Sequence, residues 1–83
     1  MTVKIEVKTS PWNKDEKTIY TDNCVTEELV EKVKEVLKEE EKVHVSFSVM
    51  GATLHDILSH QLWNLLPEYK VEIGRYKCLV QRG

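Results

Sequence analysis

The stretch KVHVSFSVM, residues 42–50, decides the fold, because it is the clearest strand pattern in the chain. Apolar and polar side chains alternate along it with a period of two, which predicts a strand with one buried face. The buried face carries Val43, Val45, Phe47 and Val49, and the polar face carries His44, Ser46, Ser48 and Met50. A strand of this kind belongs to a sheet that is covered on one side and open to solvent on the other.

A first helix is expected before this strand, over about residues 27–41. Thr26 is its expected N-cap, because a threonine hydroxyl can accept a hydrogen bond from a free amide of the first turn. The apolar stripe at helical spacing consists of Leu29, Val30, Val33, Val36 and Leu37. The glutamates at 39–41 stand at the negative end of the helix dipole, so we expect the last turn to fray.

A second helix is expected after the strand, following the break at Gly51 and ending at about Leu66, before Pro67. Thr53 and Asp56 form a start that resembles a capping box. We expect the core face of this helix to carry Leu54, Leu58, Leu62 and Leu65, with Ile57 and Leu66 flanking them.

Two hairpins complete the pattern. Residues 2–8 alternate as a half-buried strand, and residues 17–21 form a second short strand after a run of turn-forming residues. Residues 69–81 predict a hairpin that turns at Gly74 and Arg75, with glycine at the first central position of a type II′ turn. The resulting register pairs Ile73 with Tyr76, Val71 with Cys78 and Tyr69 with Val80, which places Cys78 in the core.

The predicted element order is β-β-α-β-α-β-β, which indicates an α+β fold. Amphipathic helices and strands with one polar face predict a two-layer α/β sandwich. Right-handed crossovers place both helices on one face of a mixed sheet. We expect residues 1–83 to form a single domain, since a chain of this length has room for one core.

Composition favours a folded protein of the cytoplasm. Hydrophobic residues make up 41% of the chain. There is no apolar run of about 18 residues and no signal peptide pattern, so we expect no membrane partner. Lys and Glu dominate the charged residues, a bias typical of thermophiles. Two cysteines without zinc-site spacing predict no metal, and nothing in the sequence predicts another cofactor.

The charge pattern disfavours nucleic acid as a partner. Residues 22–41 carry a net charge of −5, and a nucleic-acid binder normally shows a basic stripe. The basic candidates are confined to the last hairpin and are Lys70, Arg75, Lys77 and Arg82. The acidic first helix opposes them unless it faces away from them.

Cys24 is the one candidate for covalent chemistry, because it stands at the entrance to the first helix. Helix N-termini lower the pKa of a thiol, whereas the nearby Asp22, Glu27 and Glu28 raise it. A reactive thiol and a structural cysteine therefore both remain open.

The order of elements, the position of Cys24 and the ending RYKCLVQRG (residues 75–83) together resemble the TusA/SirA sulfur-carrier family. That family has a small intracellular βαβαββ fold with a cysteine at the start of its first helix. Its signature is Cys-Pro-x-Pro, and this chain has Cys24, Val25, Thr26 and Glu27. The resemblance implies that Cys24 carries a persulfide from a desulfurase to an acceptor protein.

The histidines offer weaker patterns. Asp56 and His60 stand four residues apart on one helical face, which suits an exposed ion pair or half of a metal site. His44, Ser46 and Ser48 form a polar row that is either a solvated sheet face or one half of a phosphoester site. No phosphate loop, Ser-His-Asp spacing or catalytic carboxylate pair is visible, which disfavours an enzyme.

Trp12 and Trp63 fall outside the core pattern, one in the first hairpin loop and the other beside Asp56 and His60. Each either folds over a core edge or anchors an interface. The leading hypothesis is a non-catalytic interaction module that binds a protein partner or forms a homodimer through Trp12, Trp63, Asp56 and His60. The alternatives are a sulfur carrier that uses Cys24 and, third, a weak nucleic-acid-binding module.

Overall fold

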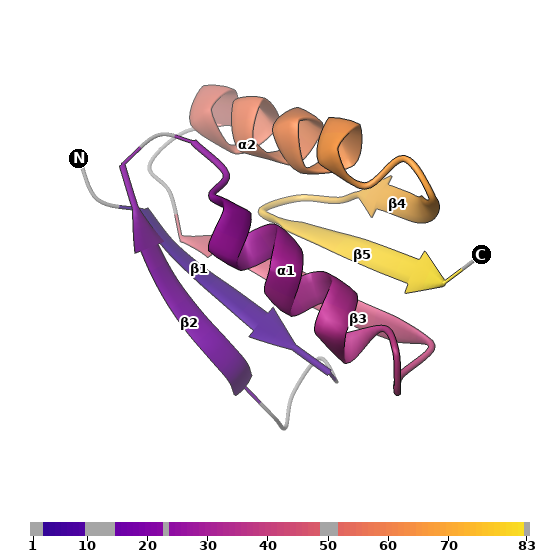
Figure 1. The fold of residues 1–83 in the computed structure, drawn as a ribbon. Helices are drawn as coiled ribbons and strands as arrows, with labels where there is room; N and C mark the ends of the chain where they lie inside the picture. Colours follow the sequence, from indigo (N-terminus) through magenta and orange to yellow (C-terminus); the bar gives the residue numbers. More distant parts are fainter. Residues whose placement is uncertain (1–2, 10–14, 23, 49–51, 83) are drawn as a thin grey trace.

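The computed structural model describes residues 3–9, 15–22, 24–48 and 52–82 (Figure 1). Its elements are β1 (Val3–Lys8), β2 (Asp15–Thr21), α1 (Glu27–Val36), β3 (Lys42–Ser48), α2 (Ala52–Leu65), β4 (Tyr69–Ile73) and β5 (Lys77–Arg82). The predicted order and the α+β class are therefore confirmed.

The five strands form one sheet in the order β2-β1-β3-β5-β4, with β3 at its centre. Every neighbouring pair is antiparallel, so the expectation of a mixed sheet is wrong. The reason lies in the connections. Each helix joins two strands that run in the same direction, but β1 lies between β2 and β3, and β5 lies between β3 and β4.

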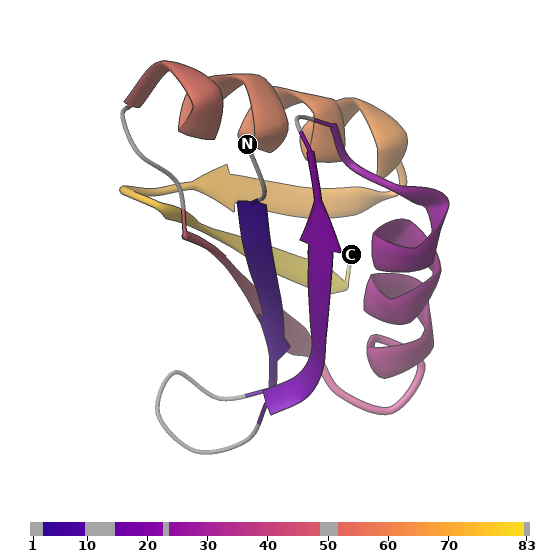
Figure 2. The ribbon, with the colours of Figure 1, turned by 90° about the vertical axis from the view of Figure 1, so that its left-hand side faces the viewer.

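Both helices cover the same face of the twisted sheet, which confirms the two-layer arrangement (Figures 1 and 2). α1 packs beside β1 and β2, and α2 lies along β4 and β5. The alternation in β3 is confirmed, because Val43, Val45 and Phe47 are buried. Fully burying one such side chain contributes about 1.5–3 kcal/mol, so the inner rows of the strands hold the layers together. Val49 and Met50 lie outside the described residues.

α1 begins where the sequence predicts, because Thr26 Oγ1 accepts a hydrogen bond from the Leu29 amide at 3.3 Å. It ends at Val36 and not at residue 41. The glutamates at 39–41 follow the helix as a turn and a loop. Negative charge at a helix C-terminus is unfavourable, which explains the shorter helix.

The face of α2 that enters the core differs from the prediction. The buried residues of this helix and its end are His55, Leu58, Ser59, Leu62 and Leu66. Leu65 is 48% exposed, and Leu54 is only partly buried. The helix is therefore rotated about its axis relative to the four-leucine stripe, and it buries a histidine and a serine in place of Leu65.

The β4–β5 hairpin also differs, because its loop has three residues, 74–76, where two were expected. Val71 pairs with Val80, and Ile73 pairs with Cys78, a shift of two positions. A shift of two keeps every side chain on its face, so Cys78 remains in the core as predicted. The loop closes through a hydrogen bond from the Gly74 amide to the Lys77 carbonyl at 2.8 Å, and Tyr76 takes a left-handed φ of 61°.

Candidate functional site

Three of the four residues predicted to bind a partner lie on one exposed side of α2. Asp56, His60 and Trp63 follow one another at helical spacing, and all three are exposed. The rings of His60 and Trp63 are tilted by 51° with their centroids 5.8 Å apart. We call these three residues the α2 aromatic face. Trp12 lies outside the described residues.

Trp63 is 50% exposed and belongs neither to the core nor to the partly buried residues packed against it. Half of its surface is therefore open to solvent. Asp56 makes a different contact from the one expected, because its Oδ1 lies 3.6 Å from Nδ1 of the neighbouring His55. No ion pair joins Asp56 to His60 in the described part of the chain.

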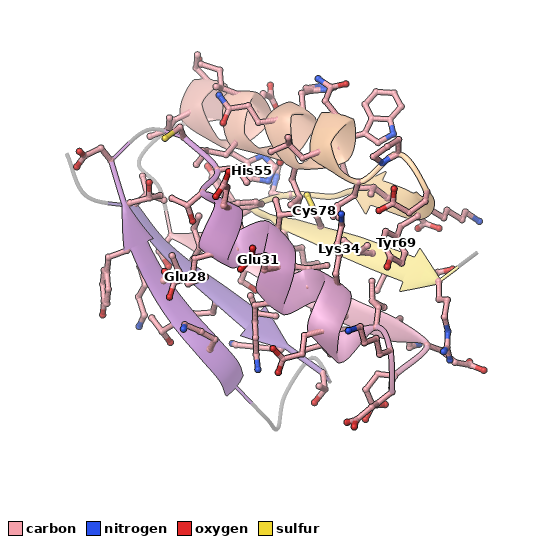
Figure 3. All side chains as sticks on the ribbon, viewed as in Figure 1. Glu28, Glu31, Lys34, His55, Tyr69 and Cys78 are labelled. Atoms are coloured by element: carbon pink, nitrogen blue, oxygen red, sulfur yellow. The ribbon has the colours of Figure 1, made fainter. Side chains whose placement is uncertain are left out.

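A buried polar chain lies beneath this face, and sequence reasoning missed it. His55 Nε2 and Ser59 Oγ are 3.3 Å apart, and Ser59 in turn hydrogen-bonds Cys78. Figure 3 shows His55 and Cys78 between α2 and the sheet. Burial raises the pKa of the Cys78 thiol, and the Ser59 hydrogen bond opposes that rise. The spacing of four between His55 and Ser59 was the available signal.

The connectivity Asp56–His55–Ser59 is that of a hydrolase triad, but its exposure is reversed. Ser59 is fully buried, His55 is 4% exposed, and Asp56 is on the surface. A substrate cannot reach the hydroxyl, so the buried side chains of His55 and Ser59 pair with each other and do not form a nucleophilic site.

Tyr76 closes the end of this region. Its ring packs on the His55 ring with centroids 5.3 Å apart, and its carbonyl accepts a hydrogen bond from the Phe47 amide at 2.9 Å. A left-handed backbone at a non-glycine residue costs about 1–3 kcal/mol, so these contacts compensate for strain. A hollow of about 320 Å³ opens beside them, lined by His55, Asp56, Gly74, Arg75 and Tyr76.

The polar row of β3 lies on the open face of the sheet. His44 is partly buried there, and its Nε2 has no hydrogen-bond partner among the described residues. Burial lowers the pKa of His44, and the charges of Lys42 and Lys77 lower it further. His55 and His60 are on α2, across the sheet, so they do not supply a second histidine for phosphoester chemistry.

Cys24 is exposed, two residues before the N-cap of α1. Its carbonyl accepts a hydrogen bond from Thr21 Oγ1 at 2.9 Å, which fixes the turn between β2 and α1. Asp22, Glu27 and Glu28 are exposed around it, and Glu28 pairs with Lys17 at 2.7 Å. The site therefore offers an accessible sulfur in an acidic setting.

Within the described residues, no group of three potential ligands could hold a metal ion, and no helix has the length and apolarity to cross a membrane. Comparisons with models of protein families, with curated proteins and with solved structures found no match.

Proposed function

We propose that the protein is a non-catalytic interaction module that binds a protein partner, or a second copy of itself, through the α2 aromatic face. The observation that carries this proposal is Trp63, half exposed and packed against His60 outside the core. We further propose that it acts in the cytoplasm, and its Lys- and Glu-rich composition supports a thermophilic source.

The α2 aromatic face has the features of an interface centre. Tryptophan is enriched among the residues that dominate binding energy, because it buries a large area at little cost in side-chain entropy. Contact with His60 restricts the Trp63 ring before binding, which lowers that cost further. Asp56 and His60 supply polar groups that a partner can pair with at the rim.

The test compares Trp63→Ala with Tyr20→Ala, because Tyr20 is also an exposed aromatic but lies on the opposite face of the sheet. Sedimentation equilibrium over a range of protein concentrations measures self-association. Immobilised wild-type and variant chains measure the retention of partners, and each partner is then purified and titrated.

We expect Trp63→Ala to weaken the measured association at least 30-fold, the effect of removing about 2 kcal/mol, and Tyr20→Ala to leave it unchanged. If the wild-type chain stays monomeric and Trp63→Ala retains the same partners with the same affinity, the proposal fails.

The exposure of Cys24 favours a second candidate, a sulfur carrier similar to the TusA/SirA family. A carrier needs a thiol that a desulfurase can reach, and this one is accessible. Incubation with a cysteine desulfurase and cysteine, followed by intact-mass measurement, tests it. A carrier gains one sulfur atom at Cys24, and Cys24→Ser does not; a wild-type mass without added sulfur argues against this candidate.

A further inference from the structure

The two faces of the molecule carry opposite charge. On the open side of the sheet, the strand residues whose side chains the structure describes include five lysines and two glutamates, an excess of three positive charges. The lysines are Lys4, Lys8, Lys42, Lys70 and Lys77, and the glutamates are Glu6 and Glu72. We call this surface the lysine face.

The helical side is acidic. α1 and the segment that follows it, to residue 41, hold seven glutamates and three lysines. Figures 1 and 2 show α1 on one face of the sheet, and the register of the strands places the lysine face on the other. The sequence alone disfavours nucleic acid as a partner because the acidic first helix would repel it. In the tertiary structure that helix faces away from the lysine face, so this objection no longer applies.

Three of the five lysines are available to an external anion. Lys8 lies 3.9 Å from Glu6 and Lys70 lies 3.7 Å from Glu72, so those charges are partly neutralised. Lys4, Lys42 and Lys77 form no ion pair with any described residue. They belong to three different strands, β1, β3 and β5, which are neighbours in the sheet.

The centre of the lysine face also offers ring surfaces and hydroxyl groups. His44 stands on β3 between the rows of Lys42 and Ser46, and a hollow of about 260 Å³ extends from it toward Lys77. Tyr20, which is 65% exposed, stands on the same face at the β2 edge. Ser46 and Ser48 continue the row along β3.

We propose that the lysine face binds single-stranded nucleic acid, with lysines on the phosphates and bases stacked on Tyr20 and His44. The five strands span about 19 Å, too wide for the roughly 12 Å major groove of a duplex. A single strand can instead lie across the sheet, because stacking on rings does not depend on sequence. Among the described residues of this face, Leu79 is the one aliphatic side chain, which does not suit insertion into an anionic membrane.

This inference goes beyond the proposed function, since it concerns the opposite face of the molecule and a different class of partner. The test is fluorescence anisotropy of a labelled oligothymidylate, titrated with the full chain at several KCl concentrations. Three phosphate contacts predict that the logarithm of the binding constant falls with the logarithm of salt concentration with a slope of about −2.

The variants are Lys4→Gln, Lys42→Gln and Lys77→Gln, each of which we expect to reduce the magnitude of that slope by about 0.7. Lys38→Gln is the matched control, because it removes the same charge from the exposed turn that follows α1 and should leave affinity and slope unchanged. Tyr20→Ala should weaken binding about five-fold or more at every salt concentration. Thermal melts monitored by circular dichroism confirm that each variant is folded.

Two further probes distinguish other anionic partners. Polyglutamate and vesicles of phosphatidylserine are titrated under the same conditions. The proposal is overturned if the oligothymidylate does not bind at low salt, if Lys38→Gln weakens binding as much as Lys77→Gln does, or if either probe binds as tightly as the oligothymidylate.

Discussion

The ring of Tyr76 packs against the buried imidazole of His55, with centroids 5.3 Å apart, from a backbone with a φ of 61°. The loop geometry demands a left-handed residue at this position, where glycine is usual. A tyrosine persists there with its ring on His55, which also packs edge-on against Phe47 at 5.6 Å. The contact between the rings of Tyr76 and His55 therefore stabilises both the β4–β5 loop and the start of α2.

Substitutions at Tyr76 separate the strain from the packing. Tyr76→Phe keeps the ring and should change the free energy of unfolding by less than about 0.5 kcal/mol. Tyr76→Ala keeps the strain and loses the ring, so we expect a loss of about 1–2 kcal/mol. Tyr76→Gly loses the ring but relieves the strain, and it should fall between the two. Urea denaturation ranks the three variants by their free energy of unfolding. If Tyr76→Gly is less stable than Tyr76→Ala, the strain at this position is not what the φ of Tyr76 indicates.

The rotation of α2 is tested by two leucines of the same helix. Leu62 is fully buried, whereas Leu65 is 48% exposed. Leu62→Ala should cost about 2–5 kcal/mol, because it leaves a cavity in the core. Leu65→Ala should cost less than about 1 kcal/mol, because its site is open to solvent. Equal losses in urea denaturation would mean that the four-leucine stripe faces the core.

Stability should depend on pH through His44. Its pKa in the folded protein is lowered from its ordinary value of 6.5 by burial, and further by Lys42 and Lys77. The unfolded chain therefore binds the proton at a higher pH than the folded protein does. The contribution of neutral His44 to the free energy of unfolding should therefore be complete above pH 6.5. It should be lost progressively as pH falls from 6.5 through the lowered pKa of the folded protein.

His44→Gln should flatten that decline, while His60→Gln serves as a control because His60 is exposed on α2. The measurement is urea denaturation at intervals between about pH 7 and pH 5, the range in which an ordinary histidine titrates. If His44→Gln loses stability with falling pH as steeply as the wild-type chain does, His44 is not the cause of the decline.

The two cysteines should differ in reactivity. Cys24 is exposed, whereas Cys78 is buried and the pKa of its thiol is raised by that burial. Fewer thiolates form at Cys78 at a given pH, and the reagent cannot reach them in the folded protein. We expect iodoacetamide to modify one thiol rapidly in the native chain and both in urea. Modification of Cys78 as fast as Cys24 in the native protein would show that the β4–β5 hairpin opens.

Local pattern predicted much of the fold. The alternation of apolar and polar residues located the strands, and Thr26 marked the start of α1, because both signals depend on neighbouring residues only. Cys78 was placed in the core even though the hairpin register was wrong by two, since a shift of two preserves the face. Helical spacing also placed Asp56, His60 and Trp63 outside the apolar stripe of α2, while it left open whether Trp63 folds over a core edge.

The contacts between elements were not available from local pattern. A leucine stripe and a stripe with His55 and Ser59 fit the same helix, and the choice depended on partners such as Cys78 and Tyr76 that are distant in sequence. The loop length of the hairpin likewise depended on how Tyr76 meets Phe47 and His55.

The sequence by itself determined which segments form strands and helices and which residues of each strand are apolar, because these follow from short-range periodicity. Only the tertiary structure decided that every strand pair is antiparallel, that α2 buries His55, and that the lysines of four strands lie on one face while the glutamates of α1 lie on the other. Those properties depend on how segments far apart in the chain are brought together, and no local pattern contains that information.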